Sequence, residues 1–117
     1  MGNNIGLNDI FNKESIIKRA RENWDFKDSE SRRKSGHKYR HIFLKSTKPI
    51  NDWSETFEKL TKEQQNILVK GELIRTYDAL PNIDKTYLKR QFNLSTFSSK
   101  WFKLPSSDKH LLLKYVI

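Results

Sequence analysis

The chain has 117 residues and a formal net charge of +9, and it contains no cysteine, which excludes disulfide bonds, zinc knuckles and thiol catalysis. Three Trp, four Tyr and seven Phe are more large rings than a disordered polyelectrolyte carries, so we expect one folded domain over residues 1–117. No apolar run is long enough to span a bilayer, and the polar N-terminus lacks the apolar core of a signal peptide. We therefore predict no membrane partner and a cytoplasmic location, or the host cytoplasm if the gene is viral.

The positive charges are segregated from the acidic residues. Asp and Glu are missing from residues 31–51 and again from residues 85–107, which carry seven and five Lys or Arg. Such segregation creates a field that attracts a polyanion, and nucleic acid is the commonest one. The nucleic-acid-binding residues predicted from these two stretches are Arg32, Arg33, Lys34, Lys38, Arg40, Lys45, Lys89, Arg90, Thr96, Ser99, Lys100 and Lys103.

The first predicted helix begins after Asn12, a favoured N-cap residue. Its apolar residues recur at helical spacing and share one face: Ile16, Ile17, Ala20 and Trp24. Residues 7–11 predict an earlier turn. Residues 25–37 are polar and predict a basic flexible loop, whose Arg32, Arg33 and Lys34 suit an arm that follows a phosphate backbone or enters a minor groove.

Residues 38–46 carry the only clear strand signal and predict one short strand or hairpin. Alternation along this segment puts three rings on one face, namely Tyr39, His41 and Phe43. Such a face can stack single-stranded bases. The alternative is an ordinary edge strand with core aromatics and edge-blunting charges, which we favour for Phe43.

Residues 52–117 predict the helical core. Thr61 and Gln64 form a capping-box pattern, and Pro81 stops the helix that follows. This helix is apolar on two sides, which is typical of a central, buried helix. Three shorter helices are predicted after it, one capped by Asp84 and ending near residue 92, one over residues 95–104 and one that begins at residue 106 or 107. The predicted fold class is therefore mainly α, with α+β as the alternative.

Residues 87–102 have the pattern of a helix-turn-helix, with a left-handed turn at Asn93 and Ser95 as the next N-cap. On the second helix of this pattern, the predicted inward arc contains Leu94, Phe97, Trp101 and Leu104, with Phe102 at its edge. The outward arc contains Ser95, Thr96, Ser99, Lys100 and Lys103. With residues 60–68 as a supporting helix, the arrangement resembles the last DNA-binding region of bacterial sigma factors. The resemblance implies DNA binding and transcription regulation. A generic helical domain with lysines on its outside is the alternative.

We expect a small basic nucleic-acid-binding protein that favours DNA over RNA, a DNA-binding regulator or a replication or transcription accessory factor. The frequent Lys, Asn and Ile are typical of an AT-rich genome such as that of a low-GC bacterium or its phage, so the gene could belong to a phage or mobile element. One alternative is an interaction module that inhibits or redirects an acidic host protein, and another is an RNA-binding or ribosome-associated protein. The sequence does not indicate an oligomeric state.

Enzyme patterns are weak. His37 and His41 are four residues apart but lie in a segment that looks extended, so we predict no metal site there. Asp9, Asp25 and Lys27 match the residue types of metal-dependent nucleases, but their segments look helical or looped instead of paired as strands. We predict no enzyme activity, no catalytic residue and no cofactor.

Overall fold

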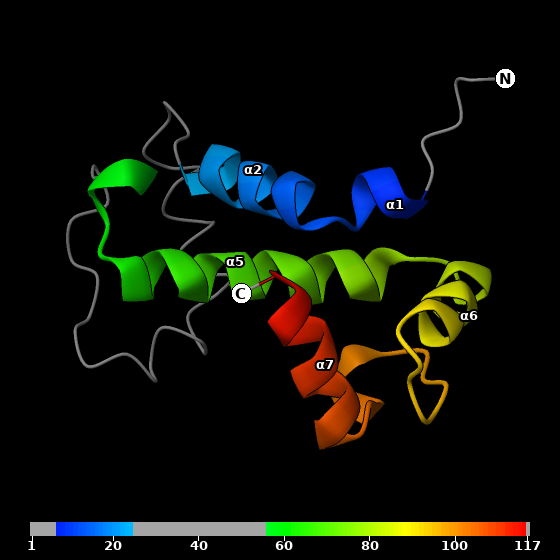
Figure 1. The fold of residues 1–117 in the computed structure, drawn as a ribbon. Coiled ribbons are helices and arrows are strands. Elements are labelled where there is room, and N and C mark those ends of the chain that lie inside the picture. The colour runs from blue at the N-terminus through cyan, green and yellow to red at the C-terminus, as the bar shows by residue number, and fades with distance from the viewer. Residues whose placement is uncertain (1–6, 25–55, 117) are drawn as a thin grey trace, which may run out of the picture.

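The computed structural model describes residues 7–24 and 56–116, which form a small bundle of helices (Figure 1). In chain order the elements are α1 (Leu7–Ile10), α2 (Lys13–Trp24), the 3₁₀ turn η1 (Phe57–Lys59), α5 (Lys62–Ala79), α6 (Asn82–Gln91), the 3₁₀ turn η2 (Trp101–Lys103) and α7 (Ser106–Val116). The part of the chain that is described contains no strand, and the mainly α fold class is confirmed. The loop predicted over residues 25–37 and the strand predicted over residues 38–46 lie outside the described residues.

Helix α5 is the centre of the bundle. Its first turn closes with the predicted capping box, because the Thr61 hydroxyl accepts the Gln64 amide N–H at 3.2 Å and the Gln64 side chain accepts the Thr61 N–H at 3.1 Å. The helix ends at Ala79, and its C-cap residue Leu80 immediately precedes Pro81. Its buried residues are Ile67, Leu68, Val69, Gly71, Glu72, Leu73, Thr76 and Tyr77. The prediction of a central, buried helix is confirmed.

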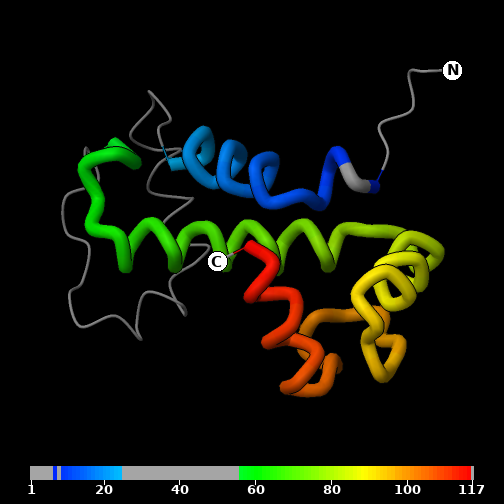
Figure 2. Tube along the Cα trace, viewed as in Figure 1, coloured from blue at the N-terminus to red at the C-terminus, as the bar shows by residue number. Residues whose placement is uncertain are grey.

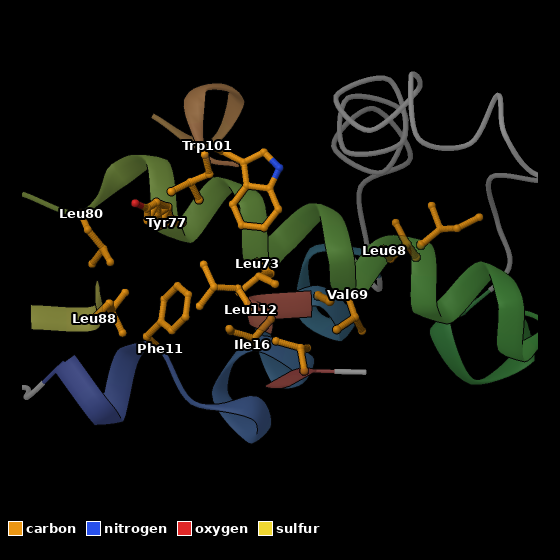
Figure 3. Close-up of a cluster of buried hydrophobic side chains, with 14 of the residues drawn as sticks. Phe11, Ile16, Leu68, Val69, Leu73, Tyr77, Leu80, Leu88, Trp101 and Leu112 are labelled. Atoms are coloured by element: carbon orange, nitrogen blue, oxygen red, sulfur yellow. The ribbon is translucent and has the colours of Figure 1, made fainter. Parts of the chain in front are cut away.

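Helix α2 packs along α5 with the opposite chain direction (Figure 2). The Asn12 side-chain oxygen accepts the Ser15 N–H at 2.8 Å, which confirms the predicted N-cap. Ile16, Ala20 and Trp24 are buried, as the helical spacing predicts. Helix α7 contacts both α2 and α5, so these three helices enclose the core, where Ile16, Leu73 and Leu112 meet (Figure 3).

A chain of aromatic rings ties the outer elements to this core. Phe92 meets Tyr115 at 4.9 Å between ring centroids, and Tyr115 stacks on Phe11 at 6.4 Å. Phe11 in turn contacts the edge of Tyr77, and Tyr77 contacts Trp101 at 5.9 Å. The rings therefore connect α7, the link between α1 and α2, α5 and η2 through contacts that are favourable beyond the burial of their surface.

One buried carboxylate lies in the middle of α5. Glu72 is 0% exposed, and its oxygens accept the Arg19 Nε at 3.3 Å, the Arg75 Nη2 at 2.7 Å and the Asn23 Nδ2 at 2.8 Å. Arg19 also donates to the carbonyl of Ile10 at 2.7 Å. An isolated charge would be very costly at this depth, so the two arginines and the amide are what make the burial of Glu72 tolerable.

Replacing Glu72 by Ala should lower the free energy of unfolding by about 2–4 kcal/mol, because Arg19 and Asn23 lose their buried acceptor and the contact between α2 and α5 loses its polar centre. Urea unfolding of the variant and the native protein measures this difference. Glu22→Gln is the matched control, since it removes an exposed carboxylate from α2 and should change stability by less than about 0.5 kcal/mol. Equal effects of the two substitutions on stability would contradict the role of Glu72 as the polar centre of the contact between α2 and α5.

Two predicted boundaries in the C-terminal half need correction. Helix α6 begins at Asn82, not after Asp84, because the carbonyl of Pro81 already accepts the N–H groups of Asp84 and Lys85 at 3.0 Å. The helix predicted over residues 95–104 is absent, and that prediction is wrong. Only the three-residue turn η2 is helical in this range, and the next helix is α7.

Candidate nucleic-acid interface

The described residues divide into a charge-balanced half and a basic half. Residues 82–116 contain seven Lys or Arg and only two carboxylates, Asp84 and Asp108. Elsewhere in the described chain, eight Lys or Arg accompany seven carboxylates. Ion pairs among the described residues occur in that balanced half: Arg19–Glu72, Arg75–Glu72 and Arg21–Glu58. The excess positive charge of the described chain therefore resides in α6, η2, α7 and the segments that connect them.

The structure places four of the predicted cations in two groups. Lys89 and Arg90 lie in the last turn of α6, whereas Lys100 and Lys103 lie at the two ends of η2. Lys89 is half-buried and the other three are exposed, and none has a carboxylate partner in the described part of the chain. The remaining predicted cations, Arg32, Arg33, Lys34, Lys38, Arg40 and Lys45, lie outside the described residues.

Helix α6 ends in a left-handed turn at Asn93, whose φ is 59°. The Leu94 N–H donates to the carbonyl of Lys89 at 2.8 Å and the Asn93 N–H donates to the carbonyl of Arg90 at 3.3 Å. This pair of bonds is the Schellman pattern that satisfies the last carbonyls of a helix. The left-handed turn predicted at Asn93 is confirmed, although no helix follows it.

Asp108 fixes the beginning of the segment after this turn. It lies in the first turn of α7 and is 4% exposed. Its oxygens accept the Ser95 N–H at 3.3 Å, the Ser95 hydroxyl at 3.2 Å and the Thr96 N–H at 3.4 Å. Thr96 therefore contributes its backbone to the fold, while its side chain is exposed.

Tyr77, Asp78 and Lys85 fix the rest of the segment. The Tyr77 hydroxyl donates to the carbonyl of Ser98 at 3.0 Å, and the Asp78 carboxylate accepts the Trp101 N–H at 2.7 Å. Lys85 is 4% exposed, donates to the carbonyls of Ser99 and Asp78, and lies 5.3 Å from the centroid of the Tyr77 ring. We call residues 93–103 the anchored loop, because polar side chains of α5, α6 and α7 hold it: Tyr77, Lys85 and Asp108, which are buried, and Asp78, which is exposed.

These anchors explain why the helix over residues 95–104 does not form. Ser and Thr compete with helical hydrogen bonds by binding nearby backbone groups, as the Ser98 hydroxyl does with the carbonyl of Lys100 at 2.7 Å. Without a helix, only some of the residues predicted to face the core are buried. Leu94, Trp101 and Leu104 are buried, but Phe97 is 40% exposed and Phe102 is 74% exposed. Ser99 is half-buried, and its backbone carbonyl accepts the Lys85 ammonium.

Comparison of the chain with protein-family models, with curated proteins and with solved structures found no match. Within residues 7–24 and 56–116, no group of three His, Asp or Glu side chains is arranged to hold a metal ion. None of the helices in these ranges is both long enough and apolar enough to cross a membrane.

Burial raises the pKa of the Tyr77 hydroxyl above the ordinary value of about 10, and the neighbouring charges of Asp78 and Asp108 add to this effect. The folded protein therefore keeps the Tyr77 proton at pH values where the unfolded chain has lost it. Stability should consequently fall as the pH rises above about 10.

Tyr77→Phe should show a smaller fall of the free energy of unfolding above about pH 10, because the variant has no Tyr77 hydroxyl to ionise. Near neutral pH the variant should be less stable than the native protein by about 0.5–1.5 kcal/mol, because the carbonyl of Ser98 loses its donor. Urea unfolding from pH 7 to pH 11.5 tests both statements. Parallel pH profiles for the variant and the native protein would contradict the proposed environment of Tyr77.

Asp108→Ala should release the start of the anchored loop. Amide hydrogen exchange at Ser95 and Thr96 should become about 10–100-fold faster, because two N–H groups lose a charged acceptor. Asp84→Ala is the matched control, since Asp84 is also the third residue of a helix that follows a proline but has no bond to the loop among the described contacts. It should cost about 0.3–1 kcal/mol of stability and leave loop exchange unchanged. Equal exchange rates in the two variants would refute the anchoring role of Asp108.

Proposed function

We propose that this protein binds nucleic acid through residues 82–116 and that most of its affinity comes from contacts to phosphates. One observation carries the proposal: six Lys or Arg of this half reach the surface without a carboxylate partner among the described residues. They are Lys89, Arg90, Lys100, Lys103, Lys109 and Lys114. Cations without counter-ions in the protein are available to displace the ions condensed on a nucleic acid.

The proposed role is that of a binding protein, such as a regulator or an accessory factor of replication or transcription, and not that of an enzyme. The proposed role does not include a helix over residues 95–104 that reads a DNA groove, because that helix is absent. Phosphate contacts carry no sequence information directly, so we expect weak discrimination among sequences. Residues 31–51 contain no acidic residue, and we use only their positive charge as support for the proposal.

The double variant Lys100→Gln/Lys103→Gln tests this proposal. Its matched control is Lys13→Gln/Lys18→Gln, which removes the same charge from exposed positions of α2 in the balanced half. Binding of labelled 20-nucleotide single strands and 20-base-pair duplexes, measured by fluorescence anisotropy at several salt concentrations, gives the slope of log K against log salt. The slope should become less negative by about 1.4–1.8 in Lys100→Gln/Lys103→Gln, because two phosphate contacts are lost, and should stay unchanged in the control.

Equal losses in the two double variants would mean that net charge alone attracts the ligand, and this result would overturn the proposed interface. A native protein that binds neither probe, or binds with no salt dependence, would overturn the proposed function itself.

An acidic protein partner is the second candidate, and the outer face of α6 favours it. Ile83 is 77% exposed and Tyr87 is 46% exposed, and at helical spacing they share this face with the exposed Arg90. Apolar and arginine side chains in such a stripe resemble the anchors of protein interfaces. A partner protein would stay attached to the tagged chain in lysate treated with nuclease, whereas a complex held by nucleic acid would be lost.

A further inference from the structure

Two phenyl rings of the anchored loop are exposed and have no ring partner in the described part of the chain. Phe102 is 74% exposed and Phe97 is 40% exposed. The ring contacts and cation–π contacts of the described residues involve neither of them. Single apolar side chains are common on protein surfaces. These two are unusual because they lie on one short segment that polar side chains of α5 and α7 hold in place.

Positive charges accompany both rings. Lys100 lies between them in the chain, Lys103 follows Phe102, and the Lys109 ammonium donates to the carbonyl of Phe102 at 3.4 Å. Two carboxylates lie against the loop: Asp108 is buried and accepts bonds from the loop backbone, and Asp78 is exposed and accepts the Trp101 N–H. Neither forms an ion pair with Lys100, Lys103 or Lys109 among the described contacts. The loop therefore presents flat apolar surfaces beside three lysines against two carboxylates.

A ligand that complements this surface carries flat apolar faces along a chain of negative charges. Single-stranded nucleic acid has this chemistry, because its bases are free to stack on aromatic side chains while its phosphates meet Lys and Arg. In a duplex, neighbouring base pairs already cover the base faces. An acidic peptide has the charges but lacks a regular series of flat faces. The observations therefore favour a single strand over both alternatives.

We propose that Phe97 and Phe102 stack on unpaired bases of single-stranded nucleic acid while Lys100 and Lys103 contact its phosphates. This inference rests on the proposed function and gives it a ligand class. The anchors of the loop contribute to binding, because a segment that is already ordered loses little conformational freedom when the strand binds. Stacking depends weakly on base identity, so affinity should vary little among base sequences.

Three 20-nucleotide probes separate the contributions of bases and phosphates: oligo(dT), an oligomer of the same length made of abasic sites, and a duplex. The native protein should bind oligo(dT) at least about tenfold more tightly than the abasic oligomer, which keeps the phosphates but has no base to stack. Phe97→Leu/Phe102→Leu should bind oligo(dT) at least about tenfold more weakly than the native protein and bind the abasic oligomer equally well. Leucine keeps apolar bulk at these exposed sites, and an unchanged thermal melting temperature verifies the fold.

Ile83→Ala is the matched control, because it removes an exposed apolar side chain that has no ring and lies outside the loop. It should leave the affinity for oligo(dT) unchanged, and an equal loss in this variant would overturn the stacking role of the two rings. Equal native affinity for oligo(dT) and the abasic oligomer would also overturn it, while the proposed function would stand. Failure of the native protein to bind any of the three probes would overturn the proposed function and the inference together.

Discussion

The burial of α5 determines how the surrounding helices pack. This helix is buried around most of its circumference, and one of its buried residues is the charged Glu72. An ion at that depth needs a partner of opposite charge and further hydrogen-bond donors, and α2 supplies them through the Arg19 guanidinium and the Asn23 amide. These bonds add to the apolar packing in specifying the register of α2 along α5. The second half of α5 then offers Tyr77 and Asp78 to the C-terminal elements.

The described carboxylates have two roles. Glu58 of η1 and Glu72 of α5 pair with arginines. Asp78, near the end of α5, and Asp108, in the first turn of α7, instead accept backbone N–H groups and hold the anchored loop. These two carboxylates order the loop without forming ion pairs with its lysines among the described contacts. The excess positive charge itself follows from the composition of residues 82–116, which contain seven Lys or Arg and two carboxylates.

Local patterns predicted the long helices well and the loop poorly. Asn12 and Thr61 mark helix starts through their own side chains, and the apolar spacing after each identifies the buried face. The segment after Asn93 instead depends on Asp78, Lys85 and Asp108, which are distant in sequence. A helical wheel consequently placed Phe97 inward, whereas 40% of its surface is exposed. One sequence signal for the turn η2 was available. At η1, an aromatic residue, any residue, Lys and Leu precede Thr61, the cap of α5. The same order recurs at η2, where it precedes Pro105.

Binding by the anchored loop depends on a segment that is rigid before any ligand binds. Backbone ¹⁵N relaxation of the free protein measures this rigidity, with α5 as the internal reference. We expect order parameters of about 0.85 through residues 93–103, equal to those of α5. Values below about 0.6 in the loop, beside rigid values in α5, would show that Tyr77, Asp78, Lys85 and Asp108 do not hold this segment.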